Sequence, residues 1–489
     1  MVAKTQATAL IMKLDYNMKN APCPHYYSDS KEPSVMFLSF YQYIMLQAKL
    51  GIIKRGVLML EKILTKGFRR TLQMTFNDIQ NQQDRRDEEE FAKDELRIKE
   101  KLLTAIKPYP VDVVLEEDFM ITAVDGSGSA NLTTLDDIRV HLLSTSVIAL
   151  YTNTKQGPIF EPVDRESVEN QIGEQPNLNS HWHSGVRGDA KKKLAESLTH
   201  IYPLKDVSSI ILPFFQDYTR GKIGTKQEIG KSVEYSKYVK MLKAMETLIS
   251  REQMLTNPVV HDELRSVSEY AAARRVLESE MRPKYLLLDG ALSVFMHFVK
   301  KFPSMPSGFM LRDLCSLARE KGVIICAVSK NHTIPFAHRI ARMAQDIFGK
   351  STKWFCQLPS KEDVGGGLHI TQDRTYIPPQ LAVPYLYSFA VDNRPSRIDF
   401  DRIWWQENIF VEGDPSATRE NEKVMFQEIE FMSRDARWYG YPVALALAHE
   451  SCKLGWDDLR LAKEICYDVR KEMGLDERRM DSLRTDYNL

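Results

Sequence analysis

Tyr285-Leu-Leu-Leu-Asp289-Gly290 is a short apolar run that ends in an aspartate and a glycine. Phe119-Met-Ile-Thr-Ala-Val-Asp125-Gly126 repeats this pattern earlier in the chain. Apolar runs of this length that stop at a turn dipeptide are typical of buried strands. We therefore predict two buried strands, each ending at Asp-Gly, and if they lie side by side their aspartates converge at one edge of a sheet.

Clustered carboxylates at a sheet edge are the hard oxygen ligands that divalent cations require. The glycine after each aspartate permits a sharp turn and leaves room for a substrate. The alternative is that each aspartate only begins a turn, since Asp-Gly is a common turn dipeptide. The sequence thus favours a metal site at Asp125 and Asp289 but leaves the turn interpretation open.

A third carboxylate is expected from the helix that precedes the second strand. Glu263, Glu269 and Glu278 all lie in this segment. Glu269 begins Glu-Tyr-Ala-Ala-Ala, whose small residues allow close packing against a sheet. We favour Glu269 for this reason and keep Glu263 and Glu278 as rivals.

Two further candidates follow other apolar segments. Lys330 ends the strand predicted at 323–330, where it would contact a phosphate or orient a water, or simply return to solvent. His449 lies in Gly440-Tyr-Pro-Val-Ala-Leu-Ala-Leu-Ala-His449, on a helix that Pro442 is suited to begin. By itself, a lone histidine on an apolar helix is more often a core residue.

The rest of the chain predicts two regions. Residues 1–110 read as an N-terminal helical extension, which Pro108 and Pro110 terminate. Residues 111–489 alternate strands and helices, with a helical insertion at about 220–280, and this alternation indicates an α/β or α+β core.

Composition excludes several classes of protein. Lys+Arg and Asp+Glu both number 66 among 489 residues, so a basic protein that coats nucleic acid is excluded, although a local basic channel is not. The six cysteines form no Cys-x-x-Cys pair and indicate reduced thiols in the cytoplasm. No uncharged apolar stretch reaches 18 residues, so we expect no membrane span.

Taken in order, four segments resemble the NurA family of DNA nucleases. They are the Asp-Gly-Ser strand at Asp125, the helical glutamate before the Leu-Leu-Leu-Asp-Gly strand at Asp289, the strand ending at Lys330, and Gly-Tyr-Pro followed by Ala-His449. The resemblance spans about 115–460 and does not include the N-terminal region.

This resemblance implies a ribonuclease H-like mixed sheet flanked by helices. It also implies hydrolysis of DNA with Mn²⁺ or Mg²⁺, as a 5′ to 3′ exonuclease with single-strand endonuclease activity. The partners implied are a HerA-type hexameric ATPase and a second copy of the chain, in DNA end processing or antiviral defence. The implied catalytic residues are Asp125, Glu269, Asp289, Lys330 and His449, of which all but Lys330 would bind the metal.

Two other classes of function stay open at this point. A non-catalytic DNA clamp or ATPase-docking subunit would keep the fold without the chemistry. A metal-dependent enzyme acting on RNA or a nucleotide would use the same carboxylates, and nothing in the sequence decides which sugar is preferred.

Overall fold

The computed structural model describes residues 69–78 and most of 106–474. The longer gaps are 112–117, 154–158, 185–188, 250–254, 293–297, 359–380 and 390–394, and the others span one or two residues. The chain divides into two compact units, 1–94 and 95–489. Within the first unit, residues 69–78 form a helix, and the rest of the predicted helical extension up to residue 105 lies outside the described residues.

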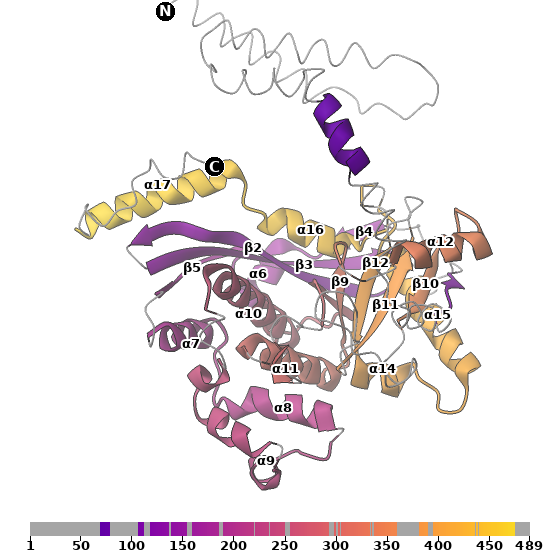
Figure 1. The fold of residues 1–489 in the computed structure, drawn as a ribbon, viewed down its shortest axis with the longest axis horizontal. Helices are drawn as coiled ribbons and strands as arrows, with labels where there is room; N and C mark the ends of the chain where they lie inside the picture. Colours follow the sequence, from indigo (N-terminus) through magenta and orange to yellow (C-terminus); the bar gives the residue numbers. More distant parts are fainter. Residues whose placement is uncertain are drawn as a thin grey trace, which may run out of the picture. The chain divides into compact units, whose positions relative to one another are not determined.

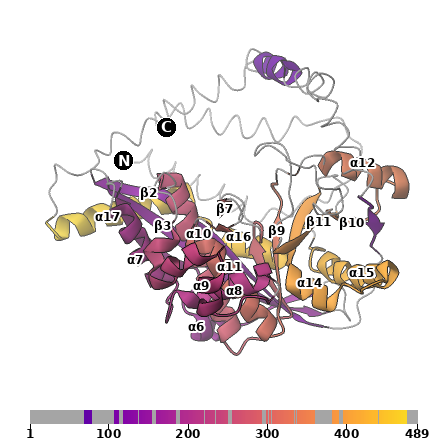
Figure 2. The same cartoon turned by 60° about the horizontal axis from the view of Figure 1, so that its bottom comes forward.

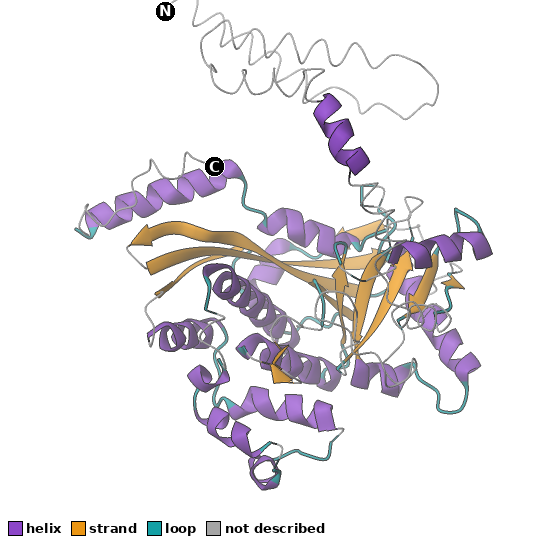
Figure 3. Cartoon of the chain, in the orientation of Figure 1, coloured by secondary structure: helices purple, strands orange, loops and turns teal. Residues whose placement is uncertain are grey.

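A mixed sheet of ten strands forms the centre of the second unit (Figure 3). Its order is β1-β10-β11-β12-β9-β6-β2-β3-β4, with β5 also paired to β3. The strands are β1 Tyr109–Pro110, β2 Met120–Leu135, β3 Ile138–Asn153, β4 Ile159–Pro162, β5 Asn177–Ser184, β6 Tyr285–Asp289, β9 Ile324–Ser329, β10 Trp354–Gln357, β11 Ala382–Ser388 and β12 Ser396–Asp401. A separate small hairpin joins β7 Phe298–Val299 to β8 Phe302–Pro303.

The strand senses at the centre of the sheet match the predicted fold. The strands β2, β3 and β4 form an antiparallel meander. Two parallel pairings follow on the other side of β2, first to β6 and then from β6 to β9. This arrangement, a meander followed by two parallel strands, is that of a ribonuclease H-like core, which confirms the predicted fold class.

The strand β2 is longer than its sequence predicts. We expected it to stop at Asp125-Gly126, but β2 continues to Leu135 and has 16 residues in all. The antiparallel partner β3 supplies the hydrogen bonds through most of this extension, whereas pairing with β6 ends at Val124 and Leu288. Asp125 therefore lies inside a strand, at the point where the sheet opens between β2 and β6.

Helices cover both faces of the sheet (Figures 1 and 2). The helices are α6 Arg165–Ile172, α7 Asp189–Ile201, α8 Ser208–Thr219, α9 Lys226–Lys231, α10 Asn257–Glu278, α11 Pro306–Glu320, α12 Ala337–Phe348, α14 Arg402–Asn408, α15 Pro415–Phe431, α16 Val443–Cys452 and α17 Trp456–Glu472, with the 3-10 helices η1 Ser236–Lys243 and η2 Met245–Leu248. The predicted helical insertion thus contains short 3-10 helices, and α10 begins at Asn257, which Pro258 follows. Among the described residues, no helix is long and apolar enough to cross a membrane.

Alternation along the strands sends side chains to two separate cores. Val124, Leu286 and Leu288 pack in one core with residues of α7, α8, α10 and α11. Ile121 and Leu287 pack in the other core with residues of α15 and α16. The helices α10 and α16 therefore lie on opposite faces of β2, and both can reach the point where the sheet opens.

Candidate active site

Asp125 and Asp289 lie next to each other where the parallel pairing ends. The last parallel pair in register joins Val124 of β2 to Leu288 of β6, and each aspartate is the next residue on its strand. By the alternation of side chains along a strand, both aspartates lie on the face of the sheet that packs against α16. Asp125 is buried and Asp289 is exposed, so one carboxylate forms the floor of the site and the other faces solvent.

Glu269 joins the two aspartates from the opposite face of the sheet. Its helix, α10, packs against β2 and β3, and the side chain is buried directly beside Gly126. A Cβ at position 126 would lie 2.6 Å from Glu269 Oε1 and 2.9 Å from its Cγ. Gly126 was expected to permit a turn, but it lies inside β2. Its lack of a side chain instead leaves space for the Glu269 carboxylate.

The structure also separates Glu269 from its two rivals. Glu263 is fully buried, and its carboxylate accepts hydrogen bonds from the Ser307 backbone N–H at 2.8 Å and from the Ser307 hydroxyl at 2.7 Å. Glu278 forms an ion pair with Arg274 at 2.8 Å on a more exposed part of α10. Glu269 is thus the candidate that the fold brings to the aspartates.

His449 reaches Asp125 from α16. Its Nδ1 lies 2.8 Å from Asp125 Oδ2 in a hydrogen bond, while about half of the imidazole side chain is exposed. The helix is anchored by Val443 and Leu445, which are buried in the core beneath it. Asp125 Oδ1 accepts the backbone N–H of Gly126 at 2.7 Å, so both carboxylate oxygens have partners.

Lys330 and Tyr441 lie on the Asp289 side of the site. Tyr441 donates a hydrogen bond from its hydroxyl to Asp289 Oδ1 at 3.3 Å, and Lys330 Nζ lies 3.6 Å from the centre of the Tyr441 ring. Partial burial lowers the pKa of Lys330, and the charges of Asp289, Glu450 and Asp125 oppose that shift. The sequence by itself provided no reason to assign Tyr441 a role. It does belong to the Gly-Tyr-Pro segment that precedes His449, and this is the signal that could have identified it.

Two buried carboxylates, Asp125 and Glu269, lie in the field of the exposed Asp289, so the three charges repel one another. Burial raises the pKa of Asp125, and the charge of Asp289 raises it further against the hydrogen bond from His449. Burial also raises the pKa of Glu269 well above its usual value, and Asp125 and Asp289 add to this, whereas the charge of Arg265 lowers it. A bound cation would relieve this repulsion.

The donor chemistry of three carboxylates and an imidazole fits a hard divalent cation. Within the described part of the chain, however, no group of three His, Cys, Asp or Glu side chains is already arranged around a common ion position. Asp125 is engaged by His449, Asp289 by Tyr441, and Glu269 lies 4.0 Å from Arg265. Metal binding would therefore require these side chains to exchange partners.

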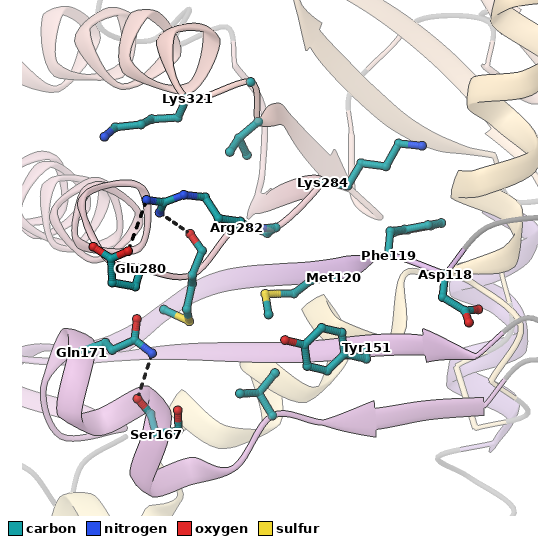
Figure 4. Close-up of a pocket in the computed structure, with 15 residues that line it drawn as sticks. Asp118, Phe119, Met120, Tyr151, Ser167, Gln171, Glu280, Arg282, Lys284 and Lys321 are labelled. Atoms are coloured by element: carbon teal, nitrogen blue, oxygen red, sulfur yellow. Dashed lines mark hydrogen bonds and ion pairs between the residues drawn. The ribbon is translucent and has the colours of Figure 1, made fainter.

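A cavity lies at the opposite ends of the same strands (Figure 4). It has a volume of about 700 Å³ and is lined by Met120 at the start of β2, by Lys284 just before β6 and by Val323 just before β9. Asp125 and Asp289 lie toward the other edge, where the parallel strands β6 and β9 end. Ligands of open α/β sheets bind beyond the carboxyl ends of the strands, so we assign the chemistry to the aspartate edge.

Comparison with known proteins gives distant structural similarity. No protein-family model and no curated protein sequence matches the chain. The NurA nuclease from Sulfolobus solfataricus is similar at 9% identity and a TM-score of 0.39, over 84% of this chain and 98% of that one. A structure of NurA bound to dAMP and manganese is similar at 10% identity and a TM-score of 0.27, over 82% of this chain and 95% of that one. Ciona intestinalis Endonuclease V, in complex with a DNA containing an inosine, is similar at 12% identity and a TM-score of 0.23, over 76% of this chain and 98% of that one. Because these TM-scores are low, the fold assignment rests on the strand order, and the function must rest on the geometry of the site.

Proposed function

We propose that this chain is a metal-dependent nuclease that hydrolyses DNA. The observation that supports this proposal is the meeting of Asp125, Asp289 and Glu269 at one point of a ribonuclease H-like sheet, from both of its faces. Three carboxylates in a partly buried site are costly to the fold unless a cation or a proton neutralises them. A function in binding divalent metal accounts for their being kept together.

Each side chain then has a chemical role. Asp125, Asp289, Glu269 and His449 would hold Mn²⁺ or Mg²⁺, which supplies an activated water and stabilises the charge of the leaving oxygen. Lys330 adds positive charge where the phosphate enters and favours the more negative transition state. His449 faces Asp125 through Nδ1, so Nε2 of the half-exposed ring is the nitrogen that would either bind the cation or exchange a proton with water or the leaving group.

The finer assignments follow the sequence resemblance and extend this proposal. We propose 5′ to 3′ exonuclease action with single-strand endonuclease activity, in a cytoplasmic homodimer that works with a HerA-type hexameric ATPase in DNA end processing or antiviral defence. Residues 1–110 are proposed to serve assembly with that partner or with a second copy.

The test is incubation of the purified chain with end-labelled single- and double-stranded DNA in Mn²⁺, in Mg²⁺ or in chelator. We expect degradation with metal and none with chelator, and labels at the 5′ and 3′ ends report the polarity. RNA of the same sequence provides the comparison for sugar preference. Intact DNA in every metal condition would refute the nuclease assignment.

A non-catalytic DNA clamp or docking subunit is the second candidate, and calorimetry separates it from the first. A nuclease binds Mn²⁺ at the carboxylates, and this binding disappears in Asp289→Asn. A platform without catalytic function binds no Mn²⁺ in either protein.

A further inference from the structure

Arg265 lies one helical turn before Glu269 on α10, so both side chains project from the same face of the helix. Its Nε is 4.0 Å from Glu269 Oε1. The arginine side chain is 39% exposed, whereas that of Glu269 is 9% exposed. Arg265 therefore bridges solvent and the buried carboxylate.

The contact between these two residues is electrostatic and loose. A separation of 4.0 Å is longer than a hydrogen bond, so no directional bond holds the guanidinium in place. The charge of Glu269 is the largest influence that raises the pKa of Arg265, and Asp262, Asp125 and Asp289 add to it. Arg265 thus sits in the field of all three site carboxylates without being locked to any of them.

The other cation of the site is differently placed. Lys330 lies over the ring of Tyr441, on the side of Asp289. Glu269, which enters from the α10 face, has Arg265 as the cation within ion-pair distance among the described residues. A divalent ion that binds Glu269 must compete with this arginine.

We propose that Arg265 is a displaceable counterion of the metal site. It neutralises Glu269 while no divalent cation is bound, and it turns to a phosphate of the DNA once the cation has taken over the carboxylate. This inference rests on the proposed nuclease function and adds a link between metal loading and substrate binding. Arginine suits both positions, because its planar guanidinium pairs with carboxylate and with phosphate.

Removing the arginine has opposite effects on the two ligands. Arg265→Gln removes the competitor for Glu269, so Mn²⁺ should bind more tightly, by roughly threefold to fivefold for a partly exposed ion pair. The same variant loses a phosphate contact, so DNA should bind more weakly, but only when metal is present. A purely structural arginine would change neither affinity in this pattern.

The first measurement is calorimetric titration of the full chain with Mn²⁺ in the absence of DNA. The control is Arg165→Gln, which removes another Arg–Glu pair of the same spacing, formed with Glu169 on α6. Tighter Mn²⁺ binding in Arg265→Gln, with the control unchanged, supports the proposal. Equal affinity in Arg265→Gln and the parent overturns it.

Thermal melting provides a second readout. Without metal, Arg265→Gln should melt below the parent because Glu269 has lost its counterion, and saturating Mn²⁺ should abolish the difference. If Arg265→Gln stays less stable by the same amount in Mn²⁺, the arginine is structural and the proposal is wrong.

The DNA arm uses fluorescence anisotropy with a labelled single-stranded oligonucleotide, in Ca²⁺ or in chelator. Arg265→Gln should weaken binding in Ca²⁺ and leave binding in chelator unchanged. An equal loss in both conditions would show that Arg265 contacts DNA independently of metal, contrary to the proposal. Should the parent chain bind no Mn²⁺, the nuclease assignment itself fails, whereas a parent that binds Mn²⁺ with an insensitive Arg265→Gln refutes this inference alone.

Discussion

Gly126→Ala tests the meeting of Glu269 with the aspartates at its closest point. The added methyl would lie 2.6 Å from Glu269 Oε1, a distance that a carbon and an oxygen cannot share. The backbone of β2 is held in register by β3 at Gly126 and Thr145, so it cannot move away without breaking that pairing. The side chain of Glu269 must therefore leave its position.

Two magnitudes follow from this displacement. Overpacking of a close contact costs about 1–3 kcal/mol of stability, so the melting temperature should fall by several degrees. If Glu269 helps to hold the metal, its displacement should also remove about 3 kcal/mol of transition-state stabilisation, which is a loss of roughly a hundredfold in cleavage rate.

Cleavage of end-labelled DNA and thermal melting measure these two effects separately. Gly230→Ala is the matched control, because its new Cβ would meet Val239 at 3.7 Å, an ordinary contact. Adding Glu269→Ala to Gly126→Ala should restore the melting temperature, since the clash is removed, but not the cleavage. Parent-like cleavage and melting in Gly126→Ala would refute the assignment of Glu269 to the site.

Three further outcomes are expected. Asp289→Asn keeps the shape of the side chain but removes a metal-binding charge, so cleavage should fall at least about a hundredfold in the same DNA assay; cleavage at the parent rate would remove Asp289 from the site. His449→Ala should lose most cleavage with little change in melting temperature, because about half of the side chain is exposed; a large drop in melting temperature with full activity at low temperature would show a structural histidine. Burial lowers the pKa of His141 to about 3, so the unfolded chain takes up its proton more readily, and the free energy of unfolding should decrease as the pH falls below about 6.5. At pH 5 this histidine alone should lower the free energy of unfolding by about 2 kcal/mol. Chemical denaturation should therefore show that the free energy of unfolding of His141→Phe depends less steeply on pH than that of the parent. Equal pH dependence in both proteins would contradict the effect.

The central strands could be predicted because their signal is local. The runs at 285–288 and 323–328 are apolar throughout, as is typical of strands covered on both faces, and they lie at the positions of β6 and β9. Their last residues mark one edge of the sheet, which is why Asp289 and Lys330 could be selected from the sequence.

Other elements depend on partners far along the chain. The extension of β2 through Ser127-Gly-Ser-Ala-Asn131 has no apolar alternation, and it is a strand because β3 pairs with most of it. Residues 208–215 form a short apolar run, in which periodicity does not distinguish a buried strand from a helix; they lie in α8, with Pro213 inside the helix. The small residues after Glu269 favoured it over its rivals, but no local pattern shows that Gly126 leaves space for its carboxylate.

The two histidines of His181-Trp-His183 show the same limit. No Cys or His follows them at zinc-finger spacing, so the sequence alone does not indicate a metal site there. The structure places both on β5, where His183 Nδ1 lies 2.8 Å from His141 Nε2 of β3. A pairing between strands so distant in sequence leaves no trace in residue spacing.

The carboxylates come from two layers of the fold, the two aspartates from the sheet and Glu269 from the helix α10. Asp125 and Asp289 share the side of the sheet covered by α16, and Glu269 crosses from the side covered by α10. Docking of α10 onto the sheet is therefore the packing step that adds the third carboxylate. For the proposed nuclease, a newly made chain would hold an incomplete carboxylate set until that helix has docked.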